Sequence, residues 1–266
     1  MKLFASDYDG TYLKHSKRGK FDLKRNIKMT KKWQEAGYLF VFATGRPIWM
    51  MQLEKKMHGI IYDYIIGLNG GIIVSKRGEI LFQKAMNQKI AKTIVKLIQQ
   101  QNFLQYSITD GICGYYHAKF GLRNKSFYLL MLFKLFLKKY SCSLEKALSQ
   151  QIVQISVETK NHDEAVRFAK QINDQFGGDV IAFANLRHVD IAAKGLSKAT
   201  GVDYVANLHS VQGHQVYCMG DSFNDVPMFE PYHGFTLPEA RQEIKDKVES
   251  IYDTVGDAML SLLRDR

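Results

Sequence analysis

The stretch Lys2-Leu3-Phe4-Ala5-Ser6-Asp7-Tyr8-Asp9-Gly10-Thr11 decides the fold of this chain. Residues 2–6 form a short, mostly apolar run that stops at an acidic side chain, which is typical of a buried strand. Because side chains alternate along an extended chain, Asp7 and Asp9 fall on the same side of it. Gly10 then allows the backbone to turn away. The stretch therefore predicts a buried strand that carries two carboxylates at its carboxyl end.

Four further segments repeat the pattern of a short apolar run, namely 38–43, 64–68, 215–219 and 234–237. Between the first two predicted strands, residues 22–36 have the apolar spacing of a helix, with Asp22 as its cap and Gly37 after its end. Strands that alternate with helices in this way indicate a parallel, doubly wound sheet. The sequence thus predicts an α/β fold.

The middle of the chain has a different rhythm. After a predicted hairpin at 72–82, five segments have a strand-like pattern, namely 105–109, 113–117, 153–158, 180–184 and 187–191. Only two segments have a helical pattern, 87–101 and 163–176. Neighbouring strands with few helices between them are typical of an α+β unit. We therefore expect an inserted α+β domain at 83–189, with 1–82 and 190–266 forming one core.

The positive charge of the chain is concentrated in two segments. With 37 Lys+Arg and 26 Asp+Glu among 266 residues the net charge is +11, and residues 14–32 and 119–139 hold nine and six of the basic side chains. Such segments suit small anionic substrates, nucleic acid or an anionic surface. The chain has no recognisable nucleic-acid-binding motif. The apolar run 127–137 is shorter than the roughly 20 residues of a membrane-spanning helix. We expect neither nucleic acid nor membrane as a partner. The alternative from a different class of function is a basic module that binds nucleic acid or an anionic surface.

The cysteines and the first residues indicate a compartment. Cys113, Cys142 and Cys218 are widely spaced and include no CxxC pair, which favours reduced thiols over a disulfide framework or a structural zinc site. Asp7 interrupts the amino-terminal apolar run before it could form the apolar region of a signal peptide. We therefore expect a cytoplasmic protein.

Polar residues follow three more of the predicted core strands. Thr44-Gly45-Arg46-Pro47 comes after 38–43, Asn69-Gly70-Gly71 after 64–68, and Gly220-Asp221-Ser222-Phe223-Asn224-Asp225 after 215–219. Functional side chains of a parallel sheet gather at the carboxyl ends of its strands. Thr44 and the free backbone N–H groups beside it suit an anion. Asn69 is expected to belong to a simple hairpin turn.

Two carboxylates within five residues, Asp221 and Asp225, are typical of a Mg²⁺ site, because hard cations prefer carboxylate oxygens. Together with the first strand they indicate phosphoryl transfer through an aspartyl phosphate. Asp7 would be the nucleophile. Asp9 would protonate the leaving oxygen and later accept a proton from water. Asp7, Asp221 and the backbone carbonyl of Asp9 would hold Mg²⁺.

Other residues would surround the phosphoryl group. Thr44 and Lys194, which precedes a predicted helix, would bind its oxygens in the transition state. Asp225 would lie behind the metal and orient its waters or Lys194. We expect further contacts with the substrate from four residues, namely Thr11, Gly45, Arg46 and Asn224.

At these residues the chain resembles the haloacid dehalogenase superfamily of phosphatases. Its four motifs are matched in order by Asp7-x-Asp9-Gly10-Thr11, Thr44-Gly45-Arg46, Lys194 and Gly220-Asp221-x-x-Asn224-Asp225. An insert between the second and third motifs resembles the Cof-type branch, whose cap is an α+β domain. The resemblance implies a Rossmann-like core, Mg²⁺ dependence and hydrolysis of small phosphorylated metabolites such as sugar phosphates. The chain departs from the branch at Pro238-Glu239-Ala240, which stands where a Gly-Asn-Ala turn is usual.

Two alternatives stay open at this point, namely the basic binding module named above and a phosphomutase. The layout also resembles phosphomannomutases, so a phosphomutase that turns its sugar over is the nearest competitor. The physiological substrate, the cap residues that select it, the role of 119–140 and the oligomeric state are not indicated by the sequence.

Overall fold

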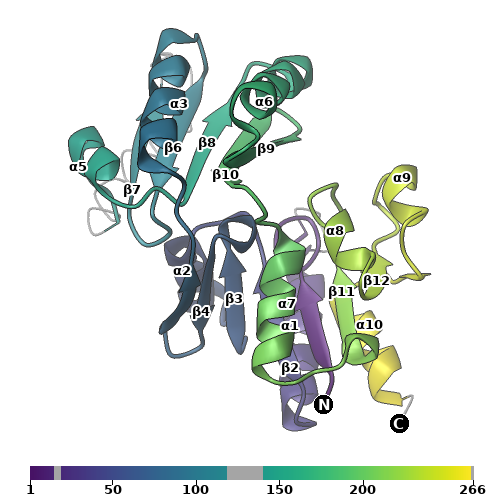
Figure 1. Cartoon of the computed structure of the whole chain (residues 1–266). Coiled ribbons are helices and arrows are strands. Elements are labelled where there is room, and N and C mark those ends of the chain that lie inside the picture. Colours follow the sequence, from purple (N-terminus) through teal and green to yellow (C-terminus); the bar gives the residue numbers. More distant parts are fainter. Residues whose placement is uncertain (15–18, 119–139, 265–266) are drawn as a thin grey trace. The chain divides into compact units, whose positions relative to one another are not determined.

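The computed structural model describes residues 1–14, 19–118 and 140–264, and they form two compact units (Figure 1). Unit 1 comprises Met1–Phe82 and Ser197–Arg266, and unit 2 comprises Gln83–Leu196. The basic segment 119–139, with its apolar run 127–137, lies outside the described residues, as do residues 15–18 of the other basic segment. Within the described part of the chain, no helix has both the length and the apolar character that a membrane crossing requires.

Unit 1 is built on one sheet with the strand order β13-β12-β11-β1-β2-β3-β4-β5. The six strands from β13 to β3 pair in parallel, and β4 runs antiparallel to β3. The bounds are β1 Leu3–Ser6, β2 Leu39–Ala43, β3 Tyr64–Gly67, β4 Ile72–Ser75, β5 Ile80–Gln83, β11 Val216–Met219, β12 His233–Thr236 and β13 Ser250–Ile251. The predicted α/β core and each of its five predicted strands are confirmed.

The helices of unit 1 are α1 Gly19–Glu35, α2 Ile48–His58, α7 Lys198–Leu208, α8 Val226–Phe229, α9 Gln242–Lys245 and α10 Val255–Arg264, with short 3-10 turns η1 Leu68–Gly70 and η2 Gly213–Gln215. The described part of α1 begins three residues before the predicted cap Asp22, which lies in its first turn. Gly37 ends α1 with a φ of 81°.

Both faces of the core sheet are buried. On one face Phe4 of β1 packs edge-on against Trp33 of α1, with ring centroids 5.8 Å apart. On the other face Leu3 and Ala5 belong to a cluster that includes Val202 of α7. A sheet covered on both faces leaves its functional side chains at the ends of the strands.

Unit 2 has an antiparallel sheet with the strand order β7-β6-β8-β10-β9. Helices α3 and α6 lie against one face of it (Figure 1). The bounds are α3 Gln88–Gln100, β6 Gln105–Thr109, β7 Gly114–Ala118, α5 Leu144–Ser149, β8 Gln154–Glu158, α6 His162–Phe176, β9 Val180–Asn185 and β10 His188–Ala193.

The second boundary of the insert differs from the one expected. The sequence pattern places it between 189 and 190, whereas unit 2 extends to Leu196. The reason is strand pairing, because β10 continues past residue 189 with Ile191 opposite Ile155 of β8 and Ala193 opposite Val180 of β9. The whole of β10 therefore belongs to unit 2.

Candidate active site

Polar loops of unit 1 meet at the carboxyl ends of β1, β2, β3 and β11. Backbone hydrogen bonds tie them together: Asp7 N donates to Met219 O at 2.8 Å and Thr44 N to Ile66 O at 2.8 Å. Asn69 N donates to Thr44 O at 3.0 Å. The side chains that follow these four strands are therefore held close to one another, as the parallel sheet predicts.

Three carboxylates form a cluster at this end of the sheet. Asp7, Asp221 and Asp225 each offer an oxygen atom within 4.8 Å of the others. Asp225 is 0% exposed and Asp7 is 4% exposed. Three of the predicted metal-site residues are thus brought together. The fourth, Asp9, was expected to contribute its backbone carbonyl, and its side chain contacts Arg46.

A buried lysine neutralises part of this charge. Lys198 Nζ lies 2.5 Å from Asp7 Oδ1 and 2.6 Å from Asp225 Oδ1, and Lys198 is 1% exposed. Burial alone would lower the pKa of Lys198, but the two carboxylates outweigh it and raise that pKa above its ordinary value. Lys198 is therefore a fixed positive charge beside Asp7.

This position corrects the expectation for Lys194. Lys194 is exposed and belongs to unit 2, where its N–H donates to Asp179 O at 2.8 Å and its carbonyl accepts from Lys84 Nζ at 2.9 Å. The lysine that contacts Asp7 lies four residues later, in the first turn of α7. A cation at a helix amino terminus is opposed by the helix dipole. That unfavourable placement, directly after the capping residue Ser197, is the signal that could have singled out Lys198.

The cluster has the charge and the donor atoms that a divalent cation requires. Burial raises the pKa of Asp7 well above its ordinary value, Lys198 opposes the shift, and the charges of Asp225 and Asp221 add to it. Burial likewise raises the pKa of Asp221. When all are charged, three carboxylates and one ammonium leave an excess of two negative charges. The donor set therefore fits Mg²⁺, which prefers carboxylate oxygens.

Asp225 also shapes the loop that carries Asp221. Its Oδ2 accepts from the backbone N of Asp221 at 3.1 Å and from that of Ser222 at 3.0 Å. A Cβ on Gly220 would lie 2.4 Å from the Asp225 Cβ, so the residue must be glycine. Asp225 thus joins the loop to Lys198.

Thr11, expected at the substrate, contacts a carboxylate instead. Its hydroxyl donates to Asp221 Oδ1 at 2.7 Å, and Thr11 is 0% exposed. Gly10 adopts a φ of 83°, and a Cβ there would lie 2.6 Å from Asp221 Oδ2. These two residues of the β1 loop therefore set the orientation of Asp221.

Arg46, also expected at the substrate, is engaged by two acids. Its Nε donates to Asp9 Oδ2 at 2.6 Å, Nη2 donates to the other Asp9 oxygen, and Nη1 donates to Glu54 Oε1 at 2.6 Å. Burial would lower the pKa of Arg46, but Asp9 and Glu54 raise it above its ordinary value. Glu54 lies on α2 and carried no motif that would have marked it in the sequence.

The remaining predicted contacts surround the same loops. Thr44 is 1% exposed, and its Oγ1 accepts from Arg46 N at 3.1 Å, across the half-buried Gly45. Asn224 Nδ2 donates to Asn69 Oδ1 at 3.1 Å. Asn69, expected to be a simple turn residue, therefore holds the loop of β11 against that of β3.

The loop Pro238-Glu239-Ala240, after β12, has a structural role. Ala240 is 9% exposed and belongs to the hydrophobic core of unit 1. Glu239 pairs with Lys14 at 3.2 Å, and Lys14 Nζ also donates to Asp253 O at 2.7 Å. These contacts tie the loop after β12 to the segment that follows the β1 loop.

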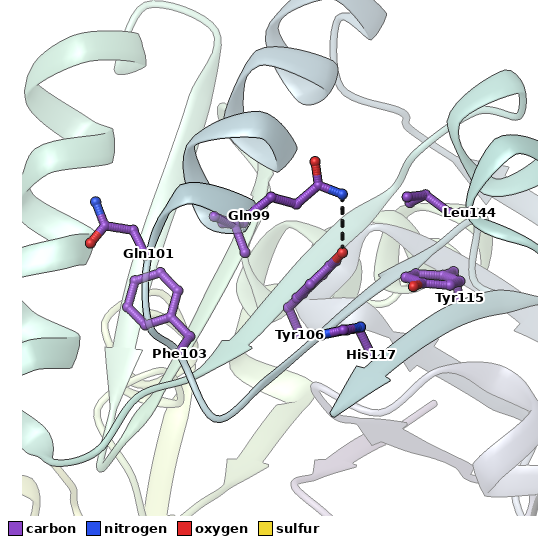
Figure 2. Close-up of a pocket in the computed structure, with 8 residues that line it drawn as sticks. Gln99, Gln101, Phe103, Tyr106, Tyr115, His117 and Leu144 are labelled. Atoms are coloured by element: carbon purple, nitrogen blue, oxygen red, sulfur yellow. Dashed lines mark hydrogen bonds between the residues drawn. The ribbon is translucent and has the colours of Figure 1, made fainter. Parts of the chain in front are cut away.

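A separate cavity of about 280 Å³ belongs to unit 2 and is lined by residues of α3, β6, β7 and α5 (Figure 2). Gln99 Nε2 donates to the Tyr106 hydroxyl at 3.3 Å, and the Tyr106 ring faces Tyr115 and His117. Among the described residues, its lining contains no carboxylate, lysine or arginine. This described part of the lining therefore offers neither carboxylate ligands for Mg²⁺ nor a fixed cation for an anionic group.

Comparison with known proteins agrees with this geometry. A family model of the haloacid dehalogenase-like hydrolases matches residues 4–258. The chain belongs to this family. A relative named "Putative phosphatase" from Buchnera aphidicola subsp. Baizongia pistaciae is 24% identical over 231 residues, which cover 86% of this chain and 82% of the relative.

Solved structures of the family share the fold. A haloacid dehalogenase-like hydrolase from B. subtilis has a TM-score of 0.81 at 18% identity, covering 98% of this chain and 100% of that one. A HAD subclass IIB sugar phosphatase has a TM-score of 0.74 at 17% identity, covering 98% and 99%. The resemblance to this superfamily and its Cof-type branch is confirmed, and the chain is a hydrolase of the family.

Proposed function

We propose that the chain is a Mg²⁺-dependent phosphatase of small phosphate esters, with sugar phosphates as the first class to test, and that it acts through an aspartyl phosphate on Asp7. The observation that carries the proposal is the buried Asp7 carboxylate, held 2.5 Å from Lys198 within the acidic cluster. A carboxylate fixed at a strand end beside a permanent cation is placed to react with an anionic phosphoryl group.

Asp7, Asp221 and the backbone carbonyl of Asp9 would hold Mg²⁺, and Asp225 would support them through Lys198 and the loop of β11. When bound, the cation offsets the negative charges of carboxylate and phosphate and so allows the two to approach. Thr11 keeps the Asp221 carboxylate in its orientation by donating a hydrogen bond at 2.7 Å.

The protein side chains perform the two chemical steps. An oxygen of Asp7 forms a bond to phosphorus as the bond to the leaving oxygen breaks, and Asp9 gives its proton to that oxygen. Asp9 then accepts a proton from the water that cleaves the aspartyl phosphate, which releases phosphate and restores Asp7. Lys198 and Thr44 stabilise the charge on the phosphoryl oxygens.

We further propose that unit 2 is a cap that selects the substrate, and that the basic segments 14–32 and 119–139 supply positive potential for anionic esters. The three cysteines are free, which suits the cytoplasmic location proposed for the chain.

The test is a panel of phosphorylated sugars and other small esters, with phosphate release in Mg²⁺ as the readout. We expect Asp7→Asn to abolish release while the protein stays folded. Asp63→Asn is the matched control, since Asp63 is a buried acid of unit 1 that pairs with Lys76 at 3.0 Å, away from the carboxylate cluster.

Wild-type turnover in Asp7→Asn would refute the covalent mechanism. An isomerised sugar phosphate that appears before free phosphate would identify a phosphomutase instead. Salt-sensitive binding of DNA or RNA without any phosphate release would favour the basic binding module.

A further inference from the structure

Glu54 is a buried carboxylate outside the acidic cluster. It lies on α2 and is 8% exposed. Its Oε1 accepts from Arg46 Nη1 at 2.6 Å, and its Oε2 accepts from the Tyr8 hydroxyl at 2.7 Å. His58 Nε2 lies 3.4 Å from the same Oε2. Each Glu54 oxygen therefore has a partner that ties α2 to one of the two loops beside it.

Tyr8 gives this contact a rigid base. Its side chain is 0% exposed and packs edge-on against Phe42 of β2, with ring centroids 5.3 Å apart. The Arg46 guanidinium carbon lies 4.9 Å from the centre of the Tyr8 ring. Burial, and then the hydrogen bond to Glu54, raise the pKa of Tyr8, so its hydroxyl keeps the proton that it donates. Tyr8 thus helps to place both Glu54 and Arg46.

Arg46 in turn holds the side chain of Asp9 in place. The Asp9 side chain is 43% exposed, whereas that of Arg46 is only 17% exposed. A carboxylate so exposed would change rotamer freely if nothing held it. The planar guanidinium donates to both Asp9 oxygens, and such a two-point contact fixes position as well as orientation.

We infer that Glu54 is a positioning residue for proton transfer by Asp9, acting through Arg46 and braced by Tyr8. The inference rests on the proposed function, in which Asp9 protonates the leaving oxygen. Tyr8 contacts Glu54 on α2, Glu54 contacts Arg46, and Arg46 contacts Asp9, which directly follows Tyr8 in the sequence. These contacts therefore define where the Asp9 carboxylate stands relative to its own strand.

A positioning role differs from a structural one in its dependence on the leaving group. An alkoxide leaves poorly and needs the proton of Asp9, whereas p-nitrophenolate leaves without one. Asp9 also acts in the later hydrolysis of the aspartyl phosphate, which both substrates share, whereas kcat/KM reports only the formation of that intermediate. A displaced Asp9 therefore lowers kcat/KM for a sugar phosphate more than for p-nitrophenyl phosphate. A general loss of folded protein lowers both rates by the same factor.

The experiment measures kcat/KM for p-nitrophenyl phosphate and for the best sugar phosphate of the panel, with the wild type and with Glu54→Ala, Glu54→Gln and Tyr8→Phe. We expect Glu54→Ala to lower kcat/KM for the sugar phosphate by about 10²-fold, the size of a small misplacement of a catalytic group. For p-nitrophenyl phosphate kcat/KM should fall only a few-fold. Asp63→Asn should leave the ratio of the two rates unchanged.

If Glu54→Ala does not fold, Glu54→Gln carries the test, because it keeps the shape but removes the negative charge that pairs with Arg46. We expect Glu54→Gln to lower the ratio of the sugar phosphate rate to the p-nitrophenyl phosphate rate by about 10-fold. Equal losses on both substrates, or an unchanged ratio in these variants, would overturn the inference and leave the proposed function standing. Wild-type turnover in Asp7→Asn would instead defeat the proposed function and the inference with it.

Discussion

Replacing Lys198 by Met removes the positive charge that stands between two buried acids. The Lys198 ammonium lies 2.5 Å from Asp7 and 2.6 Å from Asp225. With the ammonium gone, two carboxylates that are at most 4% exposed face each other without a countercharge. The exposed Lys194, in the same stretch of sequence, provides a matched control.

The magnitude follows from burial. Leaving a buried charge without its partner costs about 3–5 kcal/mol, and Lys198 serves two such partners, so we expect a loss near the upper end. An exposed side chain without buried partners changes stability by no more than about 0.5 kcal/mol, which is the expectation for Lys194→Met. Loss of a fixed charge beside Asp7, the proposed nucleophile, should also lower kcat by about 10²–10³-fold in Lys198→Met.

The assay is urea unfolding with a chelator present, so that no divalent cation substitutes for the missing ammonium, followed by phosphate release in Mg²⁺. A loss of less than about 1 kcal/mol in Lys198→Met would contradict the account of the buried pairs. If Lys194→Met loses turnover while Lys198→Met keeps it, the assignment of the lysine at the site is wrong.

Two further predictions concern the metal and the β1 loop. Mg²⁺ at a hundred times its Kd should raise the free energy of unfolding by about 2.7 kcal/mol. This gain should be smaller in Asp221→Asn and should vanish with a chelator. An equal gain in Asp221→Asn would show that Asp221 does not hold the metal. Gly10→Ala should cost about 1–3 kcal/mol for its positive φ and should also weaken Mg²⁺ binding, because the new Cβ would lie 2.6 Å from Asp221 Oδ2. Gly37→Ala, with a φ of 81° but nothing within 4 Å of its Cβ, carries the backbone cost alone, so isothermal titration with Mg²⁺ should separate the two variants, and equal affinities would contradict the steric argument.

Local patterns were sufficient for the strands and for the acids that follow them. Residues 2–6 and 215–219 are mostly apolar runs, because both faces of the sheet are covered. A polar residue marks the point where each strand leaves the core. Asp7, Asp221 and Asp225 could therefore be identified before the sheet was seen, since parallel strands bring their carboxyl ends to one edge.

The choice between Lys194 and Lys198 could not be made from that pattern. The two lysines follow the same strand and lie four residues apart, and only the extent of β10 decides which one belongs to unit 1. Strand pairing carries β10 to Ala193 and leaves Lys194 exposed in unit 2, while the start of α7 places Lys198 against Asp7. That outcome depends on hydrogen bonds between segments far apart in the chain.

The partners of Arg46 were decided in the same way. A guanidinium after Thr44-Gly45 suits a phosphate as well as a carboxylate, and sequence spacing does not tell the two apart. Packing of α2 beside β3 brings Glu54 to Arg46, and the buried ring of Tyr8 completes the contact. Residue types and strand ends thus determined the chemistry available to this protein. Which charges meet was set by tertiary packing, because an ion pair forms only where the fold brings its two members within reach.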